Sequence, residues 1–167
     1  MEELRTSNSG IGNGRNASQT YGSDATHIVL SLLSIAKSTR AFLTLVLSEI
    51  DLHPGQDQLL HRLEPESPVS VSALADQLAV RPSTVSKMLD RLIEKRLVVR
   101  AASNRDARRT MVMLTEEGEE AKRSVKLIWD RLEAELVASL NRDEVAKVTS
   151  ALDQVDDLLS AKLRRLR

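Results

Sequence analysis

Two short amphipathic patterns, joined by a very short connection, constrain this fold more than any other feature of the sequence. Apolar residues recur at Val71, Leu74, Ala75, Leu78 and Ala79, and again at Val85, Met88, Leu89, Leu92 and Ile93. Each set follows the i, i+3, i+4, i+7 and i+8 spacing that gives a helix one buried face. The connection is Val80, Arg81 and Pro82, and Pro82 suits the first position of a helix. The sequence therefore predicts two short helices joined by a tight turn.

The spacing of apolar residues changes after Leu97. Residues 98–100 and 110–114 are β-branched or apolar runs, and the residues between them are small, polar and basic. This pattern predicts a β-hairpin with a long, exposed tip. Two helices in close succession, followed by a two-stranded ribbon, describe a winged helix-turn-helix.

Charge is distributed unevenly along a chain that is neutral as a whole. Lys plus Arg and Asp plus Glu both total 24. Residues 81–109 carry nine Lys or Arg and three Asp or Glu, a net charge of +6, so the remainder carries −6. A basic unit within an acidic remainder is the electrostatic pattern expected of a nucleic-acid-binding surface.

Apolar helical patterns also flank this unit on both sides. The first pattern recurs at Ile28, Leu32, Ile35, Thr39, Phe42, Val46 and Ile50, and further leucines widen it. A helix that is apolar on several sides has to be covered on several sides, and in a short chain a second subunit is the expected cover. Two more helices are predicted after the hairpin, capped by Thr115 and by Asn141 with Glu144.

We therefore expect a mainly α fold with a small β-hairpin wing, assembled as a homodimer. Residues 25–53 and 115–167 would form the dimerisation helices, and residues 54–114 the winged helix-turn-helix. Residues 1–24 are rich in Ser, Asn, Gly and Thr and predict a disordered tail. The single indole, Trp129, is expected to pack where the C-terminal helices meet the core.

The remaining composition excludes several classes of protein. The chain contains no Cys, which excludes disulfides, thiol catalysis and Cys-based zinc sites. No nucleophile–base pair, metal cluster or glycine-rich phosphate loop is recognisable, so we expect no enzyme, no metal and no cofactor. No apolar run of about 18 residues is evident, and the N-terminus does not resemble an export signal. The expectation is a cytoplasmic protein with no membrane partner.

Polar side chains at the start of the second short helix are the candidate DNA contacts. They are Arg81, Ser83, Thr84, Ser86 and Lys87, which lie where a recognition helix meets base edges and phosphates. Lys87 can reach a guanine edge or a phosphate, and backbone amides at the helix start can bind a phosphate. Arg91 is expected to contact phosphate, whereas Lys95 is expected on a solvated face.

The predicted hairpin tip carries Arg105, Arg108 and Arg109 together with Asp106. Arginines on a projecting ribbon can enter the minor groove, where narrow A·T tracts concentrate negative potential. Asp106 does not suit a DNA contact. It is better explained as an intramolecular anchor that orients Arg108 or an arginine of the helical unit.

Three segments resemble the multiple antibiotic resistance regulator (MarR) family. They are Val85 to Leu92, the pair Asp106 and Arg108, and Leu114 to Gly118, and the resemblance covers about residues 25–165. It implies a homodimer formed by the first and last helices, two winged units set for adjacent major grooves, and a ligand cleft between the dimerisation and DNA-binding parts. By position it implies that Ser83, Thr84, Ser86 and Lys87 read the groove, while Arg108, braced by Asp106, enters the minor groove.

The resemblance also implies a transcriptional regulator, most often a repressor, that binds a pseudo-palindromic operator on double-stranded DNA. A small effector, anionic or aromatic, would release it. Arg40, His53 and Arg62 are the candidate ligand residues. Arg40 and Arg62 could pair with a carboxylate or phosphate, although surface salt bridges explain them as well, and His53 either lines the cleft or caps a helix. The three histidines are widely spaced and have no Cys partners, so no zinc site is expected.

Two rival classes remain at this stage. A winged helix can serve as a protein-interaction module without DNA contact, which predicts no loss of function when Lys87 and Arg108 are replaced by Ala. An enzyme is the other class, and no catalytic constellation supports it. Titration against a pseudo-palindromic duplex at several salt concentrations separates these classes.

Overall fold

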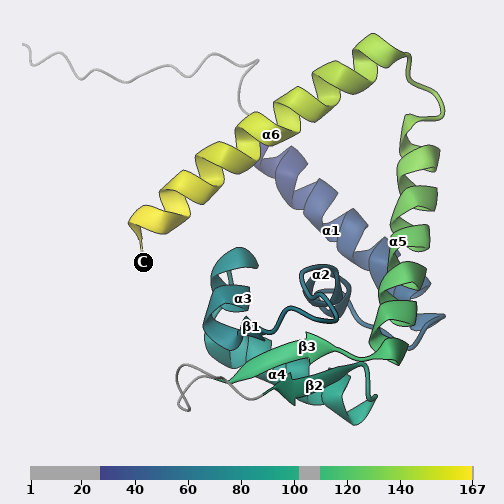
Figure 1. The fold of residues 1–167 in the computed structure, drawn as a ribbon. Coiled ribbons are helices and arrows are strands. Elements are labelled where there is room, and N and C mark those ends of the chain that lie inside the picture. The colour runs from purple at the N-terminus through teal and green to yellow at the C-terminus, as the bar shows by residue number, and fades with distance from the viewer. Residues whose placement is uncertain (1–26, 102–109, 167) are drawn as a thin grey trace, which may run out of the picture. The chain divides into compact units, whose positions relative to one another are not determined.

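The computed structural model describes residues 27–101 and 110–166 and contains six helices and three strands in these ranges. The elements are α1 Ile28–Ser48, α2 Gln56–His61, β1 Val69–Ser70, α3 Val71–Gln77, α4 Pro82–Glu94, β2 Val98–Ala101, β3 Met111–Leu114, α5 Glu116–Val137 and α6 Arg142–Arg165 (Figure 1). The chain divides into two compact units after Ser38, so α1 begins in one unit and ends in the other. The predicted tail and hairpin tip lie outside the described residues. The mainly α fold with a small β element is confirmed.

The two predicted short helices are α3 and α4. The Ser70 hydroxyl caps α3 by accepting a hydrogen bond from the Ala73 amide at 3.2 Å. Pro82 begins α4, as its fixed φ and missing N–H favour. Leu74 of α3 and Val85 of α4 are fully buried. The tight turn therefore brings two apolar faces into the same core.

The sheet has three antiparallel strands in the order β1-β3-β2, one more than the predicted hairpin. β1 pairs Val69 with Val112 and Ser70 with Met111, on the opposite edge of β3 from β2. The sequence did not predict β1 because a strand of two residues is too short to show alternation. Its pairing places the start of α3 directly beside the wing.

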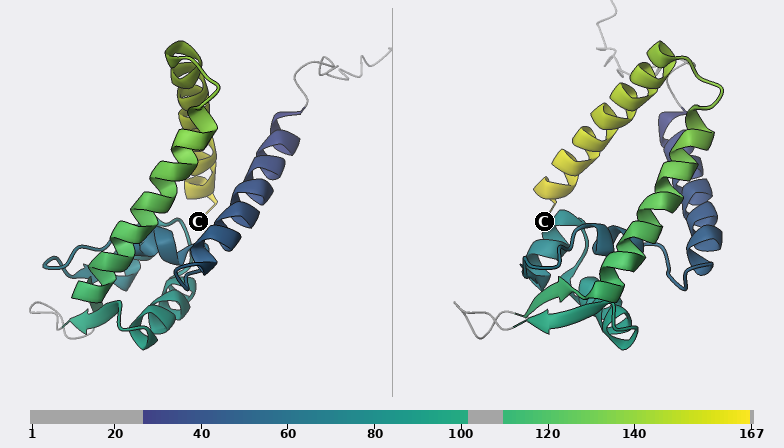
Figure 2. Two further views of the ribbon diagram at one scale, coloured as in Figure 1. Left: turned by 90° about the vertical axis from the view of Figure 1, so that its right-hand side faces the viewer. Right: turned by 45° about the vertical axis from the view of Figure 1, so that its right-hand side comes forward.

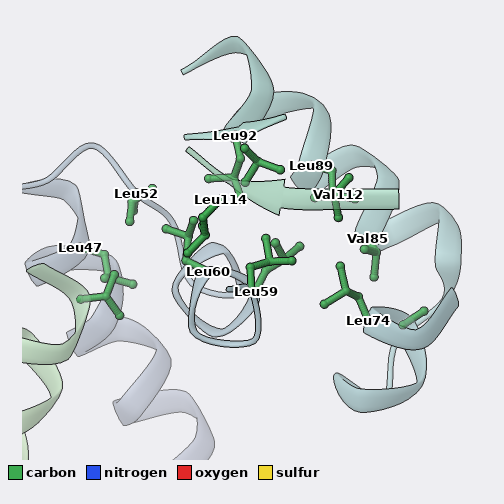
Figure 3. Packing of buried hydrophobic residues seen from close by; sticks show 14 residues of the cluster. Leu47, Leu52, Leu59, Leu60, Leu74, Val85, Leu89, Leu92, Val112 and Leu114 are labelled. Carbon is green, nitrogen blue, oxygen red and sulfur yellow. The ribbon is translucent and has the colours of Figure 1, made fainter. Parts of the chain in front are cut away.

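The core beneath these elements is aliphatic (Figure 3). Its fully buried side chains include Leu47, Leu52, Leu59, Leu60, Leu63, Leu74, Val85, Leu92, Val98, Val112, Leu114 and Val125. Trp129 is partly buried and packs against this cluster, which confirms the position expected for the indole. Close packing of branched side chains thus joins α2, α3, α4 and the sheet to α5 as far as Trp129.

The first turn of α5 is seated directly on the loop before β2. The Thr115 hydroxyl accepts a hydrogen bond from the Gly118 amide at 2.9 Å and donates one to the Arg96 carbonyl at 2.7 Å. The Thr115 amide donates to the Leu97 carbonyl at 3.2 Å. A Cβ atom on Gly118 would lie 1.9 Å from that carbonyl oxygen. Only glycine therefore fits at this position without a shift of the backbone.

An ion pair fixes the end of α4, where the sequence predicted a solvated lysine. Lys95 Nζ lies 2.7 Å from Asp51 Oδ2 and also donates to the Asp51 carbonyl. Lys95 keeps 27 % of its side chain exposed. The prediction of a purely solvated face was therefore wrong, because the partner lies 44 residues away in sequence. The Lys95 hydrogen bond and charge lower the pKa of the Asp51 carboxyl below its ordinary value.

α5 leaves the sheet at the end of β3 and continues well past it (Figure 2). α6 follows, opened by the predicted capping box of Asn141 and Glu144. No residue of α6 is buried. Large apolar side chains on α1, α5 and α6 lie exposed, namely Ile28, Val29, Leu30, Leu33, Ile35, Leu45, Leu127, Leu136, Val148, Leu152, Leu158, Leu159 and Leu163.

α1 is long and apolar enough to cross a membrane by length and composition, with a mean hydropathy of 1.5 over its best window. The expectation that the chain contains no such segment was therefore wrong. Lys37 and Arg40 lie within this helix. The core helix of a soluble protein or a signal sequence near the N-terminus can have the same length and hydropathy. The length and composition of α1 alone therefore do not indicate a membrane protein.

The contact at Gly118 predicts a large cost for adding one methyl group. Gly118→Ala should lower the free energy of unfolding by about 1–3 kcal/mol, because overpacking forces the start of α5 away from the Leu97 carbonyl. Urea unfolding measures the change, with Glu120→Ala on the exposed side of α5 as the control. A midpoint for Gly118→Ala equal to the control would contradict this account.

The Lys95–Asp51 pair predicts a specific titration. Because the folded-state pKa of Asp51 lies below its unfolded value, the pair stabilises the fold above that unfolded value, and the contribution is lost as pH falls through the folded pKa. Lys95→Met should raise the Asp51 pKa toward its ordinary value, which an NMR titration of the carboxyl carbon measures. Lys126→Met, on α5, is the control, and an unchanged Asp51 pKa in Lys95→Met would refute the assignment.

Candidate nucleic-acid interface

The exposed face of α4 carries most of the predicted DNA contacts. Val85, Leu89 and Leu92 point into the core and Met88 packs against it, so the opposite side of the helix faces outward. On the outward face lie Ser83, Thr84, Ser86, Lys87 and Arg91, all exposed, and Arg81 is exposed at the N-cap. The local periodicity of one helix thus gathers hydroxyls and cations on a single surface.

The N-terminal end of α4 favours anions. Its first turn contains no acidic residue, and Arg81 at the N-cap makes no side-chain capping hydrogen bond. The positive end of the helix dipole is therefore not offset locally, and a cation stands beside it. This end of a thirteen-residue helix can accept a phosphate of a duplex backbone.

The Ser86 hydroxyl has a defined orientation. It donates a hydrogen bond to the Pro82 carbonyl within the helix at 3.0 Å. Its donor is thereby used, while its lone pairs remain available as acceptors. In this conformation the Ser86 hydroxyl can accept a hydrogen bond from another group but has no donor left to offer.

A cavity of about 300 Å³ with a mixed polar and apolar lining adjoins α4 on the side of the sheet. It is lined by four hydroxyl residues, an ion pair and apolar side chains: Ser70, Ser72, Ser86 and Thr110, Asp90 with Arg100, and Val71, Leu89, Ile93 and Val112. Arg100 lies 3.2 Å from Asp90, and both side chains are more than half exposed. Sequence reasoning missed this cavity, because residues from α3, α4 and all three strands meet there only once the sheet has formed.

The structure does not gather the three predicted ligand residues at this cavity. Arg40, His53 and Arg62 are all exposed, and none of them lines it. The His53 amide donates to Gln56 Oε1 at 2.9 Å, a contact made by the backbone and not by the imidazole. Their role in ligand binding stays a prediction.

The predicted contacts of the wing tip, Arg105, Asp106, Arg108 and Arg109, lie outside the described residues. Within the described ranges, no three acidic or histidine side chains gather in a way that could hold a metal ion. The interface that can be built from geometry therefore consists of α4, its N-terminal end and the adjacent cavity.

Comparison with known proteins agrees with this geometry. Residues 52–118 match the model of a winged helix DNA-binding domain. No curated protein matches the chain in sequence.

Solved structures are similar over most of the chain. A MarR protein from Peptoclostridium difficile is 17 % identical with a TM-score of 0.79, covering 98 % of this chain and 100 % of that one. The reduced form of MarR from E. coli is 27 % identical with a TM-score of 0.66, covering 77 % and 95 %. MepR from S. aureus, solved in a complex with DNA, is 23 % identical with a TM-score of 0.72, covering 78 % and 96 %. The chain therefore carries a winged helix DNA-binding domain within the fold of the MarR-family regulators, which confirms the resemblance found in its sequence.

Proposed function

We propose that this protein is a homodimeric transcriptional regulator, a repressor, that binds a pseudo-palindromic DNA operator in the cytoplasm and is released by a small effector. The observation that carries the proposal is the exposed face of α4, where hydroxyls and cations gather beside an anion-favouring helix end. The winged helix match over residues 52–118 supports DNA as the partner.

In this proposal α4 is the recognition helix and lies in the major groove. Ser83, Thr84, Ser86 and Lys87 read base edges, and Arg81 and Arg91 contact phosphates. Arg105, Arg108 and Arg109 reach the adjacent minor groove, with Asp106 bracing the wing. The similarity to MepR, which was solved with DNA, supports this arrangement.

Exposed apolar surface supports the homodimer. α6 is 24 residues long and buries none of them, although Leu152, Leu159 and Leu163 follow one seam of the helix. Contiguous apolar surface of this kind marks an interaction site in a soluble protein. A second copy of the chain, pairing α1, α5 and α6, would cover it and would hold two recognition helices about one helical turn of DNA apart, ~10 base pairs.

The cavity beside α4 supports release by an effector. Arg100 and four hydroxyl residues suit a small anionic molecule, and Asp90 would have to give up part of its pairing with Arg100. Arg40, His53 and Arg62 are alternative ligand contacts in the cleft that the family resemblance implies. Either site releases DNA only if the effector binds the DNA-incompetent arrangement more tightly than the competent one.

The first prediction concerns Lys87. Lys87→Ala should weaken binding to a pseudo-palindromic promoter fragment by about 1–3 kcal/mol and relax specificity if Lys87 reads a base, or reduce the salt slope by about 1 if it contacts phosphate. Fluorescence anisotropy titrations at several salt concentrations measure both quantities. Lys126→Ala, an exposed lysine on α5, is the matched control.

Equal affinities of Lys87→Ala and Lys126→Ala would remove Lys87 from the interface. A wild-type protein indifferent to duplex DNA at low salt would refute DNA binding and leave the protein-interaction module as the better explanation.

The second prediction concerns the dimer. Leu159→Asp should convert a dimer into a monomer in sedimentation experiments, because a charge in the apolar seam of α6 would be desolvated without a partner. Affinity for a duplex with two half-sites should fall about tenfold or more, since the second half-site contact is no longer intramolecular. Gln154→Asp adds the same side chain on another side of α6 and should remain dimeric. A wild-type protein that sediments as a monomer would contradict the assembly.

A further inference from the structure

Asp57 is the only charged side chain that is buried among the described residues, with none of its surface exposed. A carboxylate removed from water is costly unless hydrogen bonds satisfy it. Asp57 Oδ1 accepts the Gly55 amide at 2.7 Å, and Oδ2 accepts Trp129 Nε1 at 3.3 Å. Neither donor carries a charge. One of them belongs to the turn that begins α2, and the other comes from α5, 72 residues away.

The hydrogen bond between Asp57 and Trp129 crosses from the winged helix domain to the helix that leaves it. Asp57 lies within the matched residues 52–118, and Trp129 lies beyond them. The Trp129 ring also contacts the ring of His61, with centroids 5.0 Å apart. α2 therefore meets α5 through a hydrogen bond and a ring contact at one level of the helix.

α5 is also attached closer to its start, by Thr115 at its first turn and by Lys122 two turns before Trp129. Lys122 Nζ donates to the Leu63 carbonyl at 2.7 Å and to Glu64 Oε1 at 2.9 Å. Lys122 and Trp129 are about 10 Å apart along the helix axis at 1.5 Å per residue. The attachment at Trp129 lies furthest from the seated first turn of α5, so it restricts the direction of the helix more than the attachments nearer to its start.

Stability alone does not explain an aspartate at this position. An apolar side chain of similar volume would fill the same space at no greater cost than a buried charge. It would also leave the Trp129 N–H without this acceptor. What the carboxylate adds is a directional bond that selects one placement of α5 on α2.

We propose that Asp57 is a positioning residue: through its hydrogen bond to Trp129 it sets the direction of α5, and with it the separation of the two recognition helices in the dimer. The inference rests on the proposed function, because that separation exists only when α5 and α6 join two copies. The sequence alone gives no sign of this role, since Asp57 resembles an ordinary acidic residue in the first turn of a helix.

Three variants separate positioning from packing. Trp129→Phe removes the N–H donor and keeps an aromatic ring. Asp57→Asn places an amide where one of the two acceptor oxygens lies. Val125→Ala is the matched control, because Val125 is a buried α5 residue, 1 % exposed, that leaves the hydrogen bond untouched. All three should lower the thermal midpoint.

Loss of packing alone would lower stability without changing how strongly the protein discriminates between half-site spacings. That discrimination is therefore the readout. The probes are a duplex selected by the wild-type protein from a random-sequence pool, the same duplex with one base pair added or removed between half-sites, and a single half-site. Wild type and Val125→Ala should discriminate against the altered spacings by about tenfold. Trp129→Phe and Asp57→Asn should discriminate by about threefold or less, with single half-site affinity within about twofold of wild type. Variants that discriminate as Val125→Ala does, or that lose half-site affinity in parallel, would overturn the proposal.

A distance measurement tests Asp57 without DNA. The chain has no Cys, so Glu94→Cys with Glu133→Cys introduces two exposed labelling sites, one at the end of α4 and one on α5 past Trp129. Spin labels on a protomer diluted with unlabelled protein report the distance within one chain. The distribution should be narrow in wild type and Val125→Ala, and broadened or shifted in Trp129→Phe and Asp57→Asn.

An unchanged distribution in these two variants would overturn the role of Asp57 even if the protein binds DNA as a dimer. Conversely, a wild-type protein that is monomeric or does not bind DNA would refute the proposed function, while the intramolecular distance would still decide whether Asp57 directs α5.

Discussion

The structure depends on an aliphatic core that α2, α3, α4 and the sheet bury together. Apolar side chains removed from water provide the main favourable free energy of folding, and none of these elements is long enough to be stable without that burial. In the part of the chain that the structure describes, the core contains no fully buried aromatic residue, so it depends on close packing of leucine and valine. The same burial turns the polar side of α4 outward. The candidate DNA surface is therefore a consequence of which side of the helix is apolar.

Polar contacts fix where helices begin and end at the edge of this core. Thr115 and Gly118 seat the first turn of α5 on the loop before β2, and Lys95 with Asp51 fixes the end of α4. Each contact joins segments that are distant in sequence at a point where a helix begins or ends. These contacts hold the start of α5 and the end of α4 in fixed positions on the same core, as the proposed DNA-binding role of α4 requires.

The proposed function depends on how the winged helix domain is joined to the apolar surfaces of α5 and α6. α6 has no buried residue, and α5 packs against the core only as far as Trp129. The exposed apolar side chains of α5 and α6 are expected of a subunit interface, whereas the polar and basic side chains of the winged helix domain are expected of a DNA-binding surface. Asp57 lies where the winged helix domain meets α5. Because its hydrogen bond to Trp129 is directional, a rearrangement of the winged helix domain would change the direction of α5, and a rearrangement of α5 would in turn act on the winged helix domain.

The sequence by itself determined the long helices, the pair α3 and α4, the caps of α5 and α6, and the outward residues of α4. The helical spacing of apolar residues, the capping residues and Pro82 act over a few positions. Such local signals can be recognised in the sequence without knowledge of the fold. The charge difference between residues 81–109 and the remainder was visible for the same reason. Only the tertiary structure decided the third strand β1, the cavity at Arg100, the Lys95–Asp51 pair and the burial of Asp57. Each of these joins segments far apart in sequence. Asp57 departs from the usual exposure of acidic residues, and one of its two hydrogen bonds comes from Trp129, 72 residues away.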